Sequence, residues 1–397
     1  MPRPVAIAAV ALVSAVAGAV LALGVGRAAG WLGSETKTVV VNPPAPGPET
    51  PAAVKPTPLA RTFDAERIYA QRSPGVVTIF SSFSTGEQGQ GSGFVVSRKG
   101  YVMTNAHVIT TAPQQPVTSA DQLYVEFSDG DRIGGDIVGY DLFSDVGLIK
   151  VSPAEHRLTP LPLGDSSRVV VGEPVATIGS PFGNENSLSV GVVSATRRSI
   201  SSVTSEYQLI DAIQTDAAIN HGTSGGPLVD AHGRVIGISA QIRSSTGNGE
   251  GVGFAVPIDT ARRSMGQLLE HGRVAYAYVG ITTDDLTPAF ARFLHYRVSS
   301  GALITCVKQG SPGAASGLRA GTNRTMFEGA QVVGGGDVIV AIDGHPVRSG
   351  TDVVRLVGQR LDPGETAVFT IFRGGNHHDV SVKLGERPSR PTPGCGG

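Results

Sequence analysis

The stretch 219-INHGTSGGPL-228 surrounds one serine with three glycines. Gly222, Gly225 and Gly226 allow backbone angles and close approaches that residues with side chains resist. One interpretation is a bend that exposes Ser224 as a nucleophile, and the other is a polar turn between two strands. The residues on either side of this stretch decide between the two interpretations.

The pattern G-x-S-x-G is shared with the nucleophile elbow of α/β-hydrolases, which needs a helix after the serine. Here the chain continues as 227-PLVDAHGRVIGIS-239. Because Pro227 cannot continue a helix interior, this segment predicts a hairpin instead. An α/β-hydrolase also needs its acid and its histidine after the serine. Histidines do follow at His232, His271 and His295, but none of these lies in such a motif.

The residues for serine catalysis lie upstream of Ser224. His107 follows an apolar run in 103-MTNAHVI-109, and Asp145 immediately precedes the run 146-VGLIKV-151. The order His, Asp, Ser is the order found in the chymotrypsin fold. A serine hydroxyl needs a base to take its proton, neutral imidazole serves near pH 7, and a carboxylate fixes the imidazole tautomer. Taken singly, each of the three residues is an ordinary packing, capping or turn residue.

Short apolar runs separated by Gly, Pro, Asp and Ser recur between Val76 and Val256. This spacing predicts an all-β barrel or sandwich. Helical periodicity appears first at 258–272, where a helix would close the domain. A second module follows at 276–385, with strand-like runs and a helix over 350–361 whose apolar residues have amphipathic spacing: Val353, Val354, Leu356, Val357 and Leu361.

Composition limits the kind of partner and cofactor. The net charge is -1 and no block of Lys and Arg occurs, which excludes nucleic acid as the main partner. Cys306 and Cys395 are too few and too far apart for a structural zinc site, and their pairing cannot be deduced from sequence. We expect no metal and no cofactor.

The N-terminus indicates the compartment. Residues 4–26 hold no charged side chain, and their length matches the roughly 20 residues that a membrane-spanning helix needs. We expect an uncleaved single-pass anchor with the bulk of the chain outside the cytoplasm. The alternative is a cleaved signal peptide and secretion. Residues 42–61 contain seven prolines and predict a stiff, extended spacer.

The chain resembles the HtrA (DegP/DegS-like) serine proteases, in which a trypsin-like domain precedes a PDZ domain. The resemblance rests on 91-GSGFVVSRKGYVMTNAHV-108, 144-SDVGLIKV-151 and 213-IQTDAAINHGTSGGPL-228, and in the second module on 311-SPGAASGLRAG-321 and 337-DVIVAIDGHPV-347. It implies a mainly β fold: a chymotrypsin-like double β-barrel followed by an α+β PDZ domain, with an N-terminal transmembrane helix.

The resemblance also assigns roles to individual residues. His107 would be the base, Asp145 its orienting partner and Ser224 the nucleophile. The oxyanion hole would be formed by the amides of Gly222, Thr223 and Ser224, and the peptide carboxylate would be bound by the PDZ loop Tyr278, Val279, Gly280 and Ile281. Substrates would be unfolded proteins in protein quality control and stress response, C-terminal peptides would occupy the PDZ domain, and the protein would be a homotrimer.

The sequence departs from the family pattern at three places. Thr223 stands where the family has asparagine, and Gly147 lies in a strand that is usually "DLAVL". Residues 322–335 are an insertion that we expect to be a surface loop. Because Thr223 changes the loop beside the nucleophile, the main alternative function is a catalytically weak, membrane-anchored sensor or chaperone-like binding protein.

The expected domain organisation follows from these segments. It comprises a membrane anchor or signal segment at 1–33, a Pro-rich linker at 34–61, a trypsin-like protease domain at 62–272, a PDZ domain at 273–386 and a disordered tail at 387–397. The pocket residues in 217–222 and 251–257 offer no aspartate for its floor, so we expect cleavage after Val, Ala, Leu or similar side chains.

Overall fold

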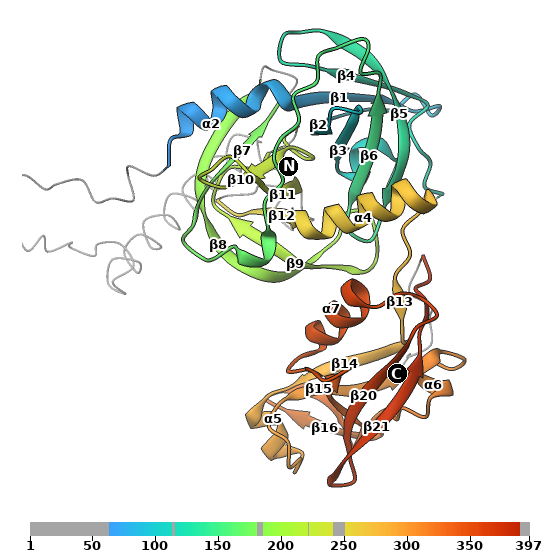
Figure 1. Cartoon of the computed structure of the whole chain (residues 1–397). Helices are drawn as coiled ribbons and strands as arrows, with labels where there is room; N and C mark the ends of the chain where they lie inside the picture. The colour runs from blue at the N-terminus through green and yellow to red at the C-terminus, as the bar shows by residue number, and fades with distance from the viewer. Residues whose placement is uncertain (1–62, 113–115, 181–185, 221, 241–250, 390–397) are drawn as a thin grey trace, which may run out of the picture. The chain divides into compact units, whose positions relative to one another are not determined.

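A computed structural model of the chain describes residues 63–112, 116–180, 186–220, 222–240 and 251–389. All of them lie in one compact unit, Thr57–Gly397. In Figure 1 the strands form two groups before the C-terminal part: β1 to β6 are blue to teal, β7 to β12 are green to yellow, and the C-terminal part is orange to red.

The first group of strands closes into a barrel in the order β1-β2-β3-β6-β5-β4. Neighbouring strands are antiparallel, and short apolar side chains such as Val77, Ile79 and Val125 fill the interior. The strands are β1 (Val76–Ser82), β2 (Gln88–Ser97), β3 (Tyr101–Thr104), β4 (Gln122–Glu126), β5 (Arg132–Asp141) and β6 (Val146–Val151).

The second group forms another closed barrel, in the order β10-β11-β12-β9-β8-β7. Its interior holds Val175, Ile213 and Leu228. The strands are β7 (Pro174–Gly179), β8 (Ser187–Ser201), β9 (Gln208–Thr215), β10 (Pro227–Val229), β11 (Val235–Ala240) and β12 (Gly253–Pro257). The predicted hairpin after Ser224 is confirmed, because β10 pairs antiparallel with β11. This arrangement excludes the nucleophile elbow.

A shared apolar core joins the two barrels. It contains Phe94 and Leu148 from the first barrel and Ile178 and Val256 from the second. Helix α4 (Ile258–His271) closes this unit, as predicted, and Gly272 ends it in the left-handed region at φ 70°. The other helical segments are α2 (Ala65–Arg72), η2 (Ser73–Gly75), α3 (Ala106–Ile109) and η3 (Ser166–Arg168).

The C-terminal module is an α+β fold around the sheet β14-β15-β18-β20-β21. The predicted amphipathic helix is present as α7, and it buries Val353, Leu356 and Val357 against that sheet. Val354 was predicted among the apolar positions but is 39% exposed, and Leu361 lies just after the end of the helix. The strands are β13 (Ala277–Tyr278), β14 (Ile281–Leu286), β15 (Gly301–Val307), β18 (Val338–Ile342), β19 (His345–Pro346), β20 (Thr366–Arg373), β21 (Asn376–Lys383) and β22 (Gly385–Glu386), and the helices are α5 (Pro288–Phe293), α6 (Pro312–Ala315) and α7 (Gly350–Arg360).

The insertion at 322–335, which we expected to be a surface loop, is mostly exposed but has regular structure. It forms an antiparallel hairpin of β16 (Asn323–Phe327) and β17 (Ala330–Gly334). The two connecting residues, Glu328 and Gly329, have φ of 49° and 82°. A two-residue loop with positive φ at both positions is typical of the type I′ turn, whose backbone twist matches the twist of the flanking strands. Phe327 anchors the hairpin, because its ring centroid lies 5.0 Å from that of Phe290.

The expected membrane helix at 4–26 and the spacer at 42–61 lie outside the described residues. Within the described ranges, no helix is long and apolar enough to cross a membrane. Cys306, on β15, is disulfide-bonded.

Candidate active site

The histidine and the aspartate predicted from sequence are brought together at the edge of the first barrel. His107 lies on the short helix α3, directly after β3, and Asp145 ends the turn before β6. Because β3 and β6 are neighbouring strands, both residues emerge at the same edge. His107 Nδ1 lies 2.8 Å from Asp145 Oδ2, and the backbone amide of His107 donates to Asp145 Oδ1 over 3.0 Å.

Asp145 is held in place by its own backbone conformation and by a hydrogen bond from Asn105. Its backbone is in the left-handed region at φ 54°, which an aspartate adopts more readily than most residues. Asn105 donates a side-chain hydrogen bond to the carbonyl of Asp145 over 2.8 Å. The Asp145 side chain is 3% exposed and the imidazole of His107 is 18% exposed. Solvent and substrate therefore reach the imidazole, while the carboxylate is enclosed.

This geometry fixes the protonation of the imidazole. A carboxylate only accepts hydrogen bonds, so Nδ1 of His107 carries a proton and Nε2 is left with its lone pair as a base. Burial by itself lowers the pKa of His107, but the charge and the hydrogen bond of Asp145 outweigh it. The net result is a His107 pKa above its usual 6.5.

The glycines around Ser224 are required by close packing. Gly225 has φ 88°, and a β-carbon there would lie 2.1 Å from the carbonyl oxygen of Ser92. A β-carbon at Gly226 would lie 2.4 Å from the carbonyl oxygen of Ile178. The bend therefore fits into a space between β2 and β7 that has no room for side chains. Because these positions carry no side chain, the Ser224 loop can pack directly against the backbone of both barrels.

The same packing brings the Ser224 loop beside the histidine segment. The amide of Ser92 donates to the carbonyl of Ser224 over 2.8 Å. A β-carbon at Gly91 would touch both the carbonyl oxygen of Ser224 and the side chain of Val108, the neighbour of His107. Ser224 Oγ is buried and has no hydrogen-bond partner among the described residues. Ser224 Oγ therefore makes no hydrogen bond to His107 in this structure.

Of the three predicted oxyanion-hole amides, one is already engaged. The amide of Thr223 donates to the carbonyl of Asn220 over 3.0 Å, and the Thr223 hydroxyl donates to the same oxygen over 2.7 Å. Gly222 has φ 90°, and its carbonyl accepts from the hydroxyl of Ser92 over 2.6 Å. The amide of Ser224 makes no hydrogen bond within the described part of the chain. Gly222 and Ser224 thus remain the candidate donors.

Asp141 is a buried structural residue at the end of β5, just before the turn that carries Asp145. It is 2% exposed, and its Oδ1 accepts from the amides of Phe143 and Ser144 over 2.9 and 3.3 Å. Its Oδ2 accepts from the hydroxyls of Ser264 (2.7 Å) and Tyr276 (2.6 Å). The carboxylate therefore ties the turn before Asp145 to α4 and to the start of the C-terminal module. In the sequence, the only sign of this role is that Asp141 lies four residues before Asp145.

Replacing Asp141 tests this positioning role. Asp141→Ala leaves buried hydroxyls and amides without an acceptor, so we expect the free energy of unfolding to fall by on the order of 3 kcal/mol. Peptidase activity is expected to fall as well, because the turn carrying Asp145 loses its support. Urea unfolding followed by circular dichroism measures the first effect. Asp136→Ala, an exposed aspartate on the same strand, is the matched control, and an equal loss in both variants would refute the role.

The predicted peptide-binding loop lies at the start of the C-terminal module. Gly280 has φ 78°, and a β-carbon there would lie 2.3 Å from the side chain of Ser311. Tyr278, Val279, Gly280 and Ile281 line a groove of about 440 Å³ together with Val353 and Val357 of α7. An extended peptide needs such a groove between a strand and a helix.

Two protein families match the chain, one over most of the double barrel and one over the C-terminal module. The trypsin-like peptidase domain family matches residues 91–238, and the PDZ domain family matches residues 277–384. A solved structure titled "HtrA-type protease AlgW with tripeptide" has a TM-score of 0.68 and 32% sequence identity, and the match covers 82% of this chain and 98% of that one.

Curated relatives are similar over a large part of the chain. A "Probable periplasmic serine endoprotease DegP-like" of Halomonas elongata is 37% identical over 307 residues, which cover 77% of this chain and 58% of that protein. "Protease Do-like 1, chloroplastic" of Arabidopsis thaliana is 36% identical over 301 residues, covering 76% of this chain and 64% of that protein. The matched part thus spans about three fifths of the length of these relatives.

Proposed function

Since the chain belongs to the family of HtrA-type serine proteases with a trypsin-like peptidase domain and one PDZ domain, we propose that it is a serine endopeptidase that cleaves unfolded proteins. The observation that carries this proposal is the contact of 2.8 Å between His107 Nδ1 and Asp145 Oδ2, next to a tightly packed loop that presents Ser224. His107 is the base, Asp145 orients it, and Ser224 is the nucleophile.

The reaction follows from these positions. Nε2 of His107 takes the proton of Ser224 as Oγ attacks the substrate carbonyl, and the amides of Gly222 and Ser224 donate to the oxyanion. The imidazolium, stabilised by Asp145, then gives its proton to the leaving amine, which leaves an acyl-enzyme on Ser224. Water enters, His107 takes its proton, and the acid product departs as Ser224 regains a proton. Loss of one oxyanion donor typically reduces the rate by about 10²–10³.

Three further features of the protein are proposed from its family: peptide regulation, membrane anchoring and assembly as a homotrimer. A peptide in the groove between β14 and α7 would regulate the protease, and Gly280 supplies the turn that such a carboxylate-binding loop needs. The uncharged segment 4–26 would anchor the chain in the cell membrane with both domains outside the cytoplasm. Assembly as a homotrimer would use α2 and the residues that precede β1.

The proposed function predicts which bonds are cut. In the described part of the pocket region, Ile219 lies against Gly253, where a β-carbon would approach Ile219 to 2.8 Å. Apolar residues at this position, with no aspartate among them, favour small and medium aliphatic side chains over Lys and Arg. We therefore expect most cleavages of a denatured protein to follow Val, Ala, Leu or similar residues. Mass spectrometry of the products measures this, and cleavage dominated by Lys and Arg would contradict it.

A second candidate function is a catalytically weak sensor or chaperone-like protein. It is favoured by the absence of a hydrogen bond to Ser224 Oγ within the described residues. This alternative predicts that Ser224→Ala suppresses the aggregation of a heated substrate as well as the wild type does, and that neither protein cleaves it. Cleavage by the wild type alone would support the endopeptidase.

A further inference from the structure

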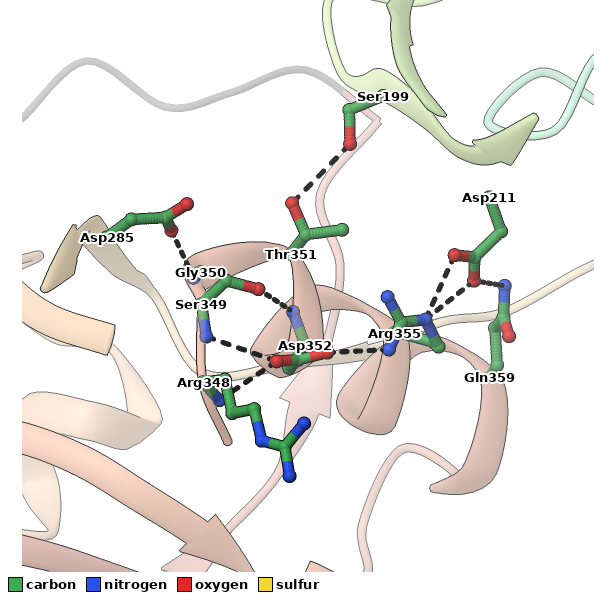
Figure 2. A network of polar contacts seen from close by, with 10 residues as sticks. All are labelled: Ser199, Asp211, Asp285, Arg348, Ser349, Gly350, Thr351, Asp352, Arg355 and Gln359. Atoms are coloured by element: carbon green, nitrogen blue, oxygen red, sulfur yellow. Dashed lines mark hydrogen bonds and ion pairs between the residues drawn. The ribbon is translucent and has the colours of Figure 1, made fainter. Parts of the chain in front are cut away.

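The groove beside α7 is bordered by the second barrel as well as by the C-terminal module. Tyr207, just before β9, lines it together with Tyr278 and Ile281. Figure 2 shows the neighbouring contacts: Asp211 of β9 accepts from Arg355 Nε over 2.9 Å and from Gln359 Nε2 over 3.2 Å. Arg355 also donates to Asp352 over 2.6 Å. These charged contacts hold α7, one wall of the groove, against β9.

Arg387 is a cation at this groove that forms no ion pair among the described residues, although the buried carboxylate of Asp141 lies near enough to favour its charged form. Its amide donates to the carbonyl of Tyr276, directly after β22 pairs with β13. The structure therefore packs a residue that we expected in the disordered tail close to the start of the 278–281 loop. The guanidinium carbon lies 5.0 Å from the ring centre of Tyr276, 5.3 Å from that of Tyr207 and 5.4 Å from that of Phe143.

The environment of Arg387 is unusual for a charged group. Burial lowers the pKa of its guanidinium. The neighbouring Tyr276, Tyr207 and Asp141 oppose this effect without cancelling it, and Arg263 lowers the pKa further. Arg263 itself has partners, the carbonyl of Gly358 and the carboxylate of Asp362. An arginine still remains charged at neutral pH. Aromatic rings compensate only part of the cost of removing a cation from water, so an added anion would be strongly favoured.

Tyr207 supplies a second unsatisfied group at the same place. Its hydroxyl is buried and has no hydrogen-bond partner in the described ranges. Buried hydroxyls without a partner are uncommon and need an explanation. Burial, with the neighbouring Tyr278, raises the pKa of Tyr207, so the hydroxyl keeps its proton and can donate. A cation without an ion pair and a hydroxyl without a hydrogen-bond partner, with their side chains in contact, match the needs of a carboxylate.

We propose that Arg387 and Tyr207 form a binding site for the C-terminal carboxylate of a peptide in the groove between β14 and α7. The proposal rests on the peptide-binding role suggested above and adds two residues to it. Both lie outside the loop 278–281, and one belongs to the second barrel. A peptide bound in this way would touch both structural units at once, so the PDZ domain without the barrel would lack part of the site.

The test uses the full chain in detergent with Ser224→Ala, so that bound peptides are not cut. A decapeptide library, randomised at its C-terminal end, is screened against this protein, and the best-bound sequence is then made as a free acid and as an amide. We expect the free acid to bind more tightly. Arg387→Gln should weaken binding of the acid by about tenfold or more, and Tyr207→Phe by about threefold or more, with little effect on the amide.

Control variants separate recognition from packing. Arg324→Gln on β16 and Tyr124→Phe on β4 make the same chemical changes at exposed positions and should leave binding unchanged. Arg387→Lys retains the charge and should keep part of the preference for the acid, and its melting temperature shows whether the fold is intact. An unchanged ratio of acid to amide affinity in Arg387→Gln would overturn this proposal alone. If no free-acid peptide bound to the Ser224→Ala protein, the peptide-binding function would fail with it.

Discussion

Ser224→Ala is expected to abolish cleavage of a denatured protein, with a loss of activity of about 10⁴-fold or more. The physical reason is that no other hydroxyl replaces Oγ in the attack, so only the binding and oxyanion contributions to the rate remain. The measurement is kcat/KM on a fluorogenic peptide with an aliphatic residue before the scissile bond. The substitution removes one buried oxygen that has no partner among the described residues, so the fold should tolerate it.

A matched variant checks that the effect is specific to the nucleophile. Ser239→Ala removes another buried hydroxyl without a partner, on β11 of the same barrel. Its activity should remain close to that of the wild type. If Ser224→Ala kept more than a tenth of the wild-type rate, Ser224 would not be the nucleophile.

Asp145→Asn is expected to reduce kcat by about 10⁴-fold, because an amide at this position no longer holds His107 in the tautomer that leaves Nε2 free. It should also change the pH profile. In the wild type Asp145 raises the pKa of His107 above 6.5, and catalysis needs neutral imidazole, so activity should decline as the pH falls through that raised pKa. Without the aspartate only burial remains, so the midpoint should move to lower pH.

The chain offers a control in a second pair of the same chemistry. His156 Nε2 lies 3.1 Å from Asp129 Oδ2 at the surface of the first barrel. Asp129→Asn should change neither the rate nor the midpoint of the pH profile. An Asp145→Asn protein with the wild-type midpoint would show that Asp145 does not set the titration of His107.

The sequence predicted the parts of the site that depend on local chemistry. The proline after the serine loop excludes a helix there, and β10 and β11 form the hairpin expected from this residue. The run of glycines indicated close backbone contact, which the space at Gly225 and Gly226 explains. The short polar segment after an apolar strand placed His107 at a strand end, where β3 and β6 bring it to Asp145.

What the sequence did not reveal depends on distant partners. Asp141 is buried because Ser264 and Tyr276, more than a hundred residues away, supply its hydrogen bonds. Arg387 follows the last strand in a Pro-rich tail, and only the pairing of β22 with β13 places it on three aromatic rings. The hairpin at 323–334 had one local signal, the glycine of the pair Glu328–Gly329, and its flanking residues do not show the alternation of an ordinary half-buried strand.

The central claim is that His107 activates Ser224 for attack on a carbonyl or an equivalent electrophile. The most direct measurement is to treat the wild-type protein with a fluorophosphonate and to locate the adduct by mass spectrometry. We predict a single adduct on Ser224 and none on this residue in His107→Ala. An unlabelled Ser224 in folded wild-type protein, or equal labelling in His107→Ala, would contradict the proposed mechanism.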